Sequence, residues 1–399
     1  MDKLRVLEGP GVWMEGAAKE QLRRVSEQPG CVATVGMPDL HAGPGIPIGA
    51  VFAFADGIHP PLIGGDAGCG ALLVGVPHGK HTGDALERRI LEQTEAPVLP
   101  TTTLEQLAPV AWAAGPRGLG EVPEIPEELA AIAAMYPVDD LPPSGPAPQD
   151  LHSQALGTTG GGNHFLELVR IGKIWDRPVA SRAGVQPRGL AVLAHSGSRG
   201  LGKMLADGWE EGPLCGAHLE HFTGQLVGAI RWAQVNRLLL AWRMLLALGT
   251  ARAERLGGLV DLVHNSALPR LIQGQALYLH RKGVAPAEAG MLTVVLGSRG
   301  TPSFLMEGAG SESCLCSVAH GAGRKMGRTE ARAKLKSRYT RASLTRTALG
   351  GRVHCDDPEL LYEEHPDAYK AVEPVIDALE AAGAARRVAE LLPLFTLKR

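Results

Sequence analysis

Aromatic residues are scarce in this chain. Phe, Trp and Tyr make up 4% of its 399 residues, which argues against a surface of several aromatic rings on which nucleic-acid bases stack. The formal net charge is −2, and this excludes a global attraction to nucleic acid or to an anionic membrane. A nucleic-acid partner would therefore have to bind at a local basic patch.

Cysteine is also sparse, and no long hydrophobic run is present. The six cysteines form no CxxC pair, and the N-terminal residues lack the apolar core of a signal peptide. The most apolar stretch, LLLAWRMLLAL at residues 238–248, is interrupted by Arg243 and is about half as long as a membrane-spanning helix. We expect a buried core helix here, a cytoplasmic protein and no membrane partner.

What is present is an ordinary globular composition, with 45% hydrophobic and 21% charged residues. Short apolar runs separated by Gly and Pro predict strands within residues 31–76, and helical periodicity follows from about 84 to 135. Further strands are predicted at FLELVRI, LAVLAHS, LVDLVHN and MLTVVLGS, with a long helical stretch at about 216–256. We predict a mixed α/β fold, with a β-sheet core surrounded by helices in one compact domain spanning residues 1–399.

Two stretches depart from this pattern. Residues 121–150 hold seven prolines and seven acids, a composition that indicates a surface excursion inserted in the domain. Residues 366–392 are predicted to form a final helix-rich section.

Four histidines lie where a strand-like run or a glycine turn ends abruptly: His164, His195, His264 and His320. The segment LIGGDAGCGALL adds Asp66 and Cys69 in a similar context. Taken singly, each residue is more often a hydrogen-bonded core or turn residue than a ligand. Together, thiolate, imidazole and carboxylate groups at the ends of stiff elements indicate a metal centre.

The DxxC spacing of Asp66 and Cys69 favours two ions over one. A thiolate is able to bridge two cations, whereas a carboxylate three residues away would reach only one of them. Two divalent ions a few Å apart are suited to phosphoryl transfer, because they stabilise both the attacking and the leaving oxygen.

The phosphates would need a binding site other than a P-loop, because no GxxxxGK[ST] motif occurs. The glycine turns at residues 160–164 and 296–303 are candidates for backbone anion-binding nests, with Asn163 and Ser298 as additional donors. Residues 324–352 carry ten Lys or Arg against one acid, Glu330. Arg328, Arg332 and Lys336 would share one helix face, which we interpret as a track for a nucleic-acid backbone, with a solvated face as the alternative.

These segments, in this order, resemble the RtcB-type RNA ligases, and the chain looks like a short, divergent member of that family. The resemblance runs from about residue 31 to the end of the chain. It is carried by MPDLHAGPGIPIG, GGDAGCG, LGTTGGGNHFLEL, HSGSRGLG, HNSA, GSRGTPS, HGAGR and PDAYK.

The resemblance implies a ligase that uses GTP and two Mn²⁺ ions to join an RNA 3′-phosphate, or a 2′,3′-cyclic phosphate, to a 5′-hydroxyl. RNA repair or tRNA splicing, through a guanylylated histidine and an RNA-3′-pp-5′-G intermediate, would be its role, with an archease-type activator as a possible partner. By motif position, His320 is the nucleophile. The implied metal ligands are Asp66, Cys69, His164, His195 and His264. The implied nucleotide contacts are Asn163, Glu167, Ser298, Ser303, Gly323, Tyr369 and Lys398, and the implied RNA contacts are Arg199 and Arg324.

Some expectations stay open at this point. Imidazole and thiolate ligands by themselves favour Zn²⁺, so Mn²⁺ follows from the resemblance alone. Leu296, Arg299, Gly327 and Arg399 depart from the usual family residues near the expected guanosine pocket, which leaves the preference for GTP open. Two rival functions are a dinuclear metal phosphoesterase acting on RNA ends and a non-catalytic RNA-binding protein with a structural metal.

Overall fold

The larger of the sheets joins strands that lie far apart in the sequence. The computed structural model describes residues 2–77, 83–207, 209 and 212–399. In these residues the larger sheet has the order β11-β12-β15-β5-β6-β4-β7, and β14 pairs with β15 off this path. Its strands are β4 (Gly70–Val76), β5 (Phe165–Ile174), β6 (Leu190–Ser196), β7 (Gly258–Val263), β11 (Leu292–Val295), β12 (Ser303–Gly308), β14 (Arg352–Cys355) and β15 (Ala385–Lys398).

A second sheet has the order β1-β2-β3-β9-β8, and β10 pairs with β13 in a separate two-stranded unit. These strands are β1 (Leu4–Val6), β2 (Cys31–His41), β3 (Ile48–Phe54), β8 (Asn265–Ile272), β9 (Gln275–Lys282), β10 (Val284–Pro286) and β13 (Ser317–Ala319). The two sheets share one apolar core, in which Val35 and Val51 of the second sheet and Leu73 and Leu193 of the first are buried. A β-strand alternates its side chains between two faces, so strand β4 also sends Leu72 to the opposite face, beneath the helices.

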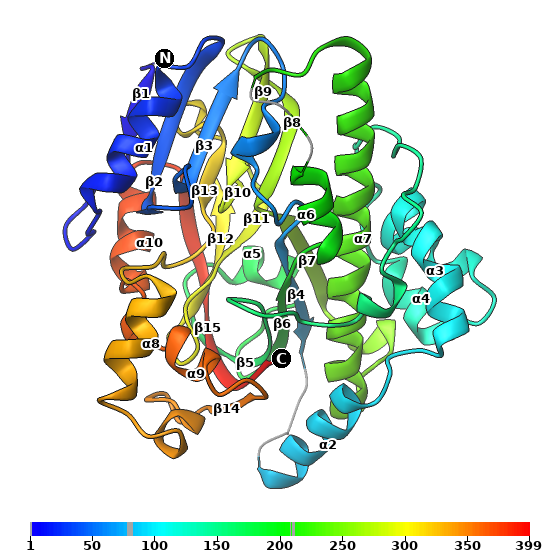
Figure 1. Cartoon of the computed structure of the whole chain (residues 1–399). Coiled ribbons are helices and arrows are strands. Elements are labelled where there is room, and N and C mark those ends of the chain that lie inside the picture. Colours follow the sequence, from blue (N-terminus) through cyan, green and yellow to red (C-terminus); the bar gives the residue numbers. More distant parts are fainter. Residues whose placement is uncertain (1, 78–82, 208, 210–211) are drawn as a thin grey trace.

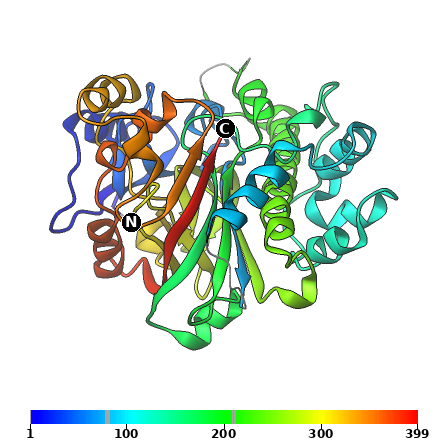
Figure 2. The ribbon, with the colours of Figure 1, turned by 90° about the horizontal axis from the view of Figure 1, so that it is seen from below.

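Helices cover the outer faces of this arrangement (Figures 1 and 2). The longest, α7 (Gly216–Leu248), packs on β4 and β6. It is in turn covered by α2 (Asp84–Glu95) and α3 (Thr101–Ala114) (Figure 2). The other helices are α1 (Gly16–Ser26), α4 (Glu127–Ala133), α5 (Arg177–Arg182), α6 (Gly200–Ala206), α8 (Arg328–Lys336), α9 (Leu360–Glu363) and α10 (Val372–Ala381).

The predicted mixed α/β class is confirmed, with the described residues forming one compact domain. The apolar run 238–248 is the buried C-terminal third of α7, as predicted. Arg243 is tolerated inside this core because its Nη1 donates to the backbone carbonyls of Gln93, Thr94 and Ala96. Within the described residues, α7 included, no helix combines the length and hydropathy needed to cross a membrane.

The prediction for residues 366–392 is wrong in its second half. Helix α10 ends at Ala381, and Ala385–Lys398 form β15, an inner strand of the larger sheet. Local sequence did not reveal this strand, because its hydrogen bonds go to β12 and β5, which are remote in sequence. Such tertiary pairing overrides local propensity.

The surface interpretation of residues 121–150 is wrong for the part that forms and follows α4. Leu129 and Ile132 are fully buried, Tyr136 is 4% exposed, and all three belong to the main apolar cluster. The prolines frame this short helix, which is amphipathic and covers the core. From Val138 to Asp150 the chain forms no helix or strand.

Candidate active site

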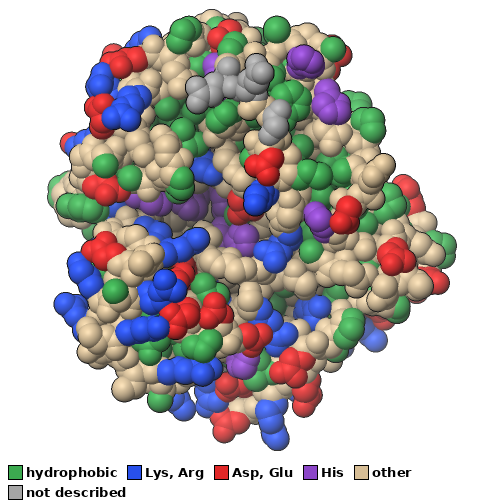
Figure 3. Space-filling model, in the orientation of Figure 1, with side chains coloured by type: hydrophobic (Ala, Val, Ile, Leu, Met, Phe, Trp, Pro, Cys, Tyr) green, Lys and Arg blue, Asp and Glu red, His purple; other side chains and the backbone are tan. Residues whose placement is uncertain are grey.

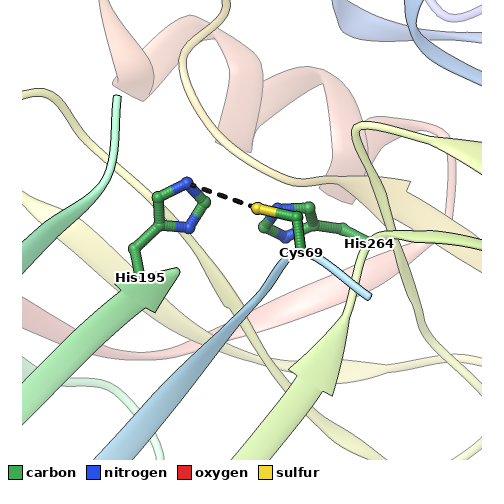
Figure 4. Close-up of side chains that lie close together, drawn as sticks. All are labelled: Cys69, His195 and His264. Atoms are coloured by element: carbon green, nitrogen blue, oxygen red, sulfur yellow. Dashed lines mark hydrogen bonds between the residues drawn. The ribbon is translucent and has the colours of Figure 1, made fainter. Parts of the chain in front are cut away.

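Three neighbouring strands of the larger sheet deliver a thiol and two imidazoles to one point. In this sheet β4 lies between β6 and β7, and Gly70 pairs with both Ser196 and Val263. The residues next to these partners are Cys69, His195 and His264, so the sheet register places them side by side. Figure 4 shows these three side chains pointing toward one another at the strand ends.

The Cys69 thiol is the centre of the cluster. Its Sγ lies 3.4 Å from Nε2 of His164, 3.9 Å from Nε2 of His195 and 3.3 Å from Nε2 of His264. His164 precedes β5, and its Nε2 also lies 3.0 Å from Oδ2 of Asp66. Two groups of ligand atoms, each within 4.8 Å, result: Asp66, Cys69 and His164 form one, and Cys69, His195 and His264 form the other. The thiol therefore belongs to both.

Burial dominates the electrostatics of this cluster. Burial and then the Asp66 carboxylate raise the pKa of Cys69 well above its ordinary value. Burial and the neighbouring imidazoles lower the pKa of His195 and His264. Burial opposes ionisation of Asp66, but the hydrogen bond and charge of His164 prevail and lower its pKa. The imidazoles of His195 and His264 are thus held neutral, as a metal ligand requires, while the thiolate of Cys69 needs a nearby positive charge to form.

The residues fit a transition or zinc-group metal. Thiolate and imidazole are the donors such ions prefer, with a carboxylate on one side. The Nδ1 atoms of His164, His195 and His264 are buried and have no hydrogen-bond partner among the described residues. The Nε2 atoms of the same three rings converge on Cys69 Sγ, so Nε2 is the ligand atom that each ring offers to a metal.

His320 lies beside the cluster in the same cavity. Its ring centroid is 5.1 Å from that of His264, and it follows β13 directly. Its Nδ1 is 2.8 Å from Oδ2 of Asp39, a carboxylate on β2 with no solvent exposure. The contact between Nδ1 and Asp39 leaves the opposite ring nitrogen, Nε2, available as a nucleophile.

The cavity has a volume of 260 Å³. Figure 3 shows histidine side chains at the base of a hollow near the centre of one face, with Lys and Arg side chains around it. The predicted residues that line it are Asp66, Cys69, Asn163, His195, His264, Ser298, His320, Gly323, Arg324 and Tyr369. The structure therefore brings the expected nucleophile, five of the expected nucleotide and RNA contacts and most of the expected ligands into one space.

Three predicted nucleotide contacts lie beneath the lining instead. Glu167 on β5 is 2% exposed and accepts a hydrogen bond from Thr396 Oγ1, and burial raises its pKa to about 7. Lys398 donates from Nζ to the carbonyl of His164 at 2.8 Å. Ser303 Oγ accepts from the backbone N–H of Gly297 at 2.9 Å and so supports the glycine turn at 296–303.

Arg199 does not line the cavity that holds His320. It borders a larger neighbouring cavity of 960 Å³, on the other side of the glycine turn at 160–164. Its φ is +58°, a backbone conformation uncommon for a residue other than glycine. Its Nε is buried and has no hydrogen-bond partner among the described residues.

The basic run forms the predicted helix but not the predicted free basic face. One side of α8 carries Arg328, Arg332 and Lys336. That side faces acidic residues in and next to α9. Arg332 Nη1 lies 3.5 Å from carboxylate oxygens of Glu359 and Glu363, and Lys336 Nζ lies 2.6 Å from Glu359. The interpretation of this face as a track for nucleic acid is therefore not supported, because its charges are compensated within the protein.

Arg324 is likewise engaged with protein atoms. Its Nη1 donates to Glu364 at 3.0 Å and to the Tyr369 hydroxyl at 3.1 Å, and its Nη2 donates to the Glu363 carbonyl. Glu364 is 3% exposed and lines the cavity. Burial opposes ionisation of Glu364, but the nearby cations, first Lys398 and then Arg324, lower its pKa.

Sequence reasoning assigned no role to Lys282 and Glu364, which line the cavity, or to Asp39, which contacts His320. Asp39 had a local signal because it lies inside the motif MPDLHAGPGIPIG, whereas Lys282 is the last residue of β9. Lys282 Nζ donates to the Ile63 carbonyl at 2.8 Å next to the Asp66 turn. Glu364 had no signal, because only the folding of α9 against the cavity places it there.

The departures from the family pattern fall in three places. Leu296 and Arg299 line the cavity, and Arg299 Nη2 donates to the Leu361 carbonyl of α9. Arg399 lines the larger cavity, where its Nη1 donates to the Thr94 carbonyl. Gly327 precedes α8 as its N-terminal flanking residue.

The fold and the site together define a mixed α/β protein whose strand ends hold a cysteine and imidazole cluster suited to metal ions, beside a histidine in contact with a buried carboxylate. A comparison with known protein families identifies the family of this chain. The family model described as "tRNA-splicing ligase RtcB" matches residues 21–214 and 213–399. The chain belongs to the RtcB family.

Relatives from several organisms match along nearly the whole chain. The RNA-splicing ligase RtcB2 of Escherichia coli is 34% identical over 408 residues, covering 100% of this chain and 96% of that protein. The tRNA-splicing ligase RtcB of Archaeoglobus fulgidus is 28% identical over 455 residues, covering 96% and 92%. The RNA-splicing ligase RtcB of Mycobacterium tuberculosis is 28% identical over 443 residues, covering 95% and 100%.

Proposed function

We propose that this chain is an RNA ligase that uses GTP and two Mn²⁺ ions to join RNA 3′-phosphate or 2′,3′-cyclic phosphate ends to 5′-hydroxyl ends. Membership of the RtcB family supports the RNA ligase function. The observation that carries the finer proposal is the position of His320. It lies next to a cluster in which one thiol belongs to two groups of metal ligands, and its Nδ1 contacts a buried carboxylate.

The metals would be held by two sets of residues. Asp66, Cys69 and His164 would hold one ion, and Cys69, His195 and His264 the other. Bound there, two divalent ions would neutralise phosphate oxygens and so lower the barrier to attack on phosphorus. Mn²⁺ is the family expectation, and Zn²⁺ is the competitor that this donor set would bind more tightly.

In the first step Nε2 of His320 attacks the α-phosphorus of GTP. A P–N bond forms, the bond from the α-phosphorus to the bridging oxygen breaks, and pyrophosphate leaves. Asp39 keeps the proton on Nδ1 and stabilises the charge that develops on the ring, as a carboxylate does for the histidine of a catalytic triad. Lys282 lines the same cavity and would add an amine donor for the phosphates.

In the second step an oxygen of the RNA 3′-phosphate attacks the phosphorus of the histidine-bound GMP. The P–N bond breaks, His320 is regenerated, and an RNA-3′-pp-5′-G end results. The 5′-hydroxyl of the second RNA then attacks the 3′-phosphorus, and GMP leaves with the electron pair of the broken P–O bond. A 2′,3′-cyclic phosphate enters this sequence after water has opened it to a 3′-phosphate.

The guanosine would lie between the glycine turn at 296–303 and Tyr369. Ser298 and Asn163 present donors to this part of the cavity, and Gly323 has a φ of +72° and packs against the backbone of Asp39. Glu167 and Lys398 would have to contact the guanine base from beneath the residues that line the cavity. Arg199, with its unpaired Nε, is the proposed RNA phosphate contact, whereas Arg324 would have to leave Glu364 to serve that role.

The decisive experiment is a guanylylation assay with GTP labelled at the α-phosphorus, in the presence of Mn²⁺. We expect the wild-type chain to retain label after denaturation and His320→Ala to retain none. His59→Ala is the matched control, because His59 is also a mostly buried histidine in contact with an aspartate, Asp56, but lies outside the cavity. Equal labelling of wild type and His320→Ala, or labelling of neither, would contradict the mechanism.

A ligation assay on RNAs with defined ends tests the polarity. We expect product from a 3′-phosphate and a 5′-hydroxyl, and none from a 3′-hydroxyl and a 5′-phosphate. Metal-dependent hydrolysis of RNA phosphate ends without any labelled adduct would identify a dinuclear phosphoesterase instead. Tight metal retention with no turnover of GTP or RNA would identify a binding protein with a structural metal.

A further inference from the structure

Two consecutive residues of α7 interrupt its apolar packing directly behind the strand-end cluster. Asn236 and Arg237 each have 0% exposure, and Arg237 is among the largest fully buried side chains of the described protein. A buried guanidinium is costly unless its donors are paired. The partners of these two side chains therefore indicate what the fold gains by burying them.

Arg237 binds the turns that carry two of the candidate ligands. Its Nη1 donates to the Gly68 carbonyl at 3.0 Å and to the Ser196 carbonyl at 2.9 Å. Gly68 precedes Cys69, and Ser196 follows His195. The other edge of the guanidinium pairs with Asp261 of β7, with Nη2 at 2.6 Å from Oδ1. Asp261 also accepts a hydrogen bond from the Tyr136 hydroxyl at 3.0 Å. One planar group thus links β4, β6 and β7, the three strands that deliver Cys69, His195 and His264.

Asn236 binds the remaining turn. Its Oδ1 accepts from the Thr158 backbone N–H at 3.1 Å, and its Nδ2 donates to the Thr158 carbonyl at 3.2 Å. The same Nδ2 lies 3.1 Å from Ser196 Oγ and 3.3 Å from the Gly197 carbonyl. Thr158 begins the glycine turn that leads to His164. This amide therefore ties the His164 turn to the end of β6.

The turn that carries Asp66 and Cys69 is tightly packed against the same helix. Gly68 has a φ of +76°, and a Cβ there would lie 3.1 Å from the Ala229 carbonyl of α7. A Cβ on Gly197 would lie 2.2 Å from Oδ1 of Asp66. Because Gly68 lies so close to the α7 backbone, the position of α7 constrains the turn that carries Asp66 and Cys69.

We propose that Asn236 and Arg237 are positioning residues that hold the Asp66–Cys69, His164, His195 and His264 segments in the spacing required for metal binding. The inference rests on the proposed function, because it assigns a role toward the same metal centre. Neither side chain lines the cavity, so both act through the backbone of the ligand segments. Loss of the partners that orient metal ligands typically weakens metal affinity about 10- to 100-fold.

The test compares Arg237→Lys and Asn236→Ala with a matched control, Arg231→Lys. Arg231 lies on the same helix, pairs with Asp139 through two nitrogens and donates to the Ala113 carbonyl, but has no contact with the ligand turns. Lys keeps the charge and loses the planar fork that binds several oxygens at once. Circular dichroism melting establishes that each variant is folded, and Asn236→Ala decides the outcome if Arg237→Lys does not fold.

The first readout is a Co²⁺ titration followed by the thiolate-to-metal charge-transfer absorption. We expect both variants to bind Co²⁺ about tenfold more weakly or worse, with an altered absorption band, and the control to match wild type. Wild-type affinity and an unchanged band in both variants would overturn the inference. The absence of cobalt binding in the wild-type chain would instead contradict the proposed metal centre.

The second readout needs no metal. Amide hydrogen exchange of the metal-free chain should be about tenfold faster or more in residues 66–70, 158–164 and 195–198 of the two variants, because these segments lose their anchor. The control should exchange there like wild type. Unchanged exchange in all three segments would overturn the positioning role even if the metal centre proved absent.

Discussion

The strand-end cluster and the α8 helix are both rich in titratable side chains, yet they differ in how those side chains are satisfied. In the cluster, three imidazoles and a thiol are buried, and the Nδ1 atoms of the imidazoles have no partner among the described residues. Along α8, Arg332 and Lys336 face Glu359 and Glu363 at ion-pair distance. In the cluster, side chains from separate turns converge on one thiol, as a binding site requires, whereas the charges of α8 pair with Glu359 and Glu363.

The strongest test of this comparison is removal of the shared thiol. Cys69→Ser should lose both ions together, because Sγ belongs to both groups of ligands. We expect an affinity loss of at least about 100-fold and no detectable ligation, with metal content after dialysis as the measurement. Cys31→Ser, a buried cysteine in the second sheet, should keep the metal. Retention of one ion per chain by Cys69→Ser would show that the thiol does not bridge.

Asp39→Asn should be the next largest effect. The amide cannot stabilise a positive charge on His320 and permits the wrong ring tautomer, and such a change costs a catalytic histidine about 10²- to 10⁴-fold in rate. Guanylylation rate is the measurement, with metal content expected to stay unchanged because Asp39 is not a ligand. Asp56→Asn, which removes the carboxylate beside His59, is the control. A parallel loss in both variants would point to stability as the cause.

Metal affinity should also depend on pH. The pKa of Cys69 is raised, so the thiol is protonated near neutral pH and must release that proton when a metal binds. The pKa values of His195 and His264 are lowered, so these rings are already neutral and release none. Affinity should therefore rise about tenfold per pH unit, one proton per cluster, in the window above the lowered histidine pKa values and below the raised cysteine pKa. Competition with a chelator between pH 6 and 8 measures this slope, and a flat profile would contradict it.

The smallest effect is expected on α8. Arg332→Ala removes ion pairs that are partly exposed, so unfolding free energy should change by less than about 1 kcal/mol. RNA affinity should stay within about twofold, because the charge is already compensated by Glu359 and Glu363. Arg338→Ala is the companion variant, since Arg338 is exposed on the same segment and no ion pair to it is recorded among the described residues. A loss in RNA affinity of tenfold or more for Arg332→Ala would restore the nucleic-acid track.

Much of the fold and of the site was predictable. Apolar runs with strand or helix periodicity predicted strands β2 to β7, strand β11 and the core helix, because those elements bury the residues that their own pattern supplies. The strand β15 was missed because its hydrogen bonds lie with β12 and β5. The acid Glu364 was missed for a related reason: it reaches the cavity only when α9 packs there.

The sequence by itself determined which potential metal ligands the chain carries. It showed which histidines, which cysteine and which acid lie at the ends of helices and strands, and in what order. Tertiary structure alone decided which of these groups meet. Coordination depends on a few Å between atoms up to 195 residues apart, such as Sγ of Cys69 and Nε2 of His264. That separation is set by the register of β6, β4 and β7, and by the packing of α7 beneath their ends. Tertiary packing likewise decided that the basic side chains of α8 pair with neighbouring acids, because a charge is compensated only when an opposite charge folds against it.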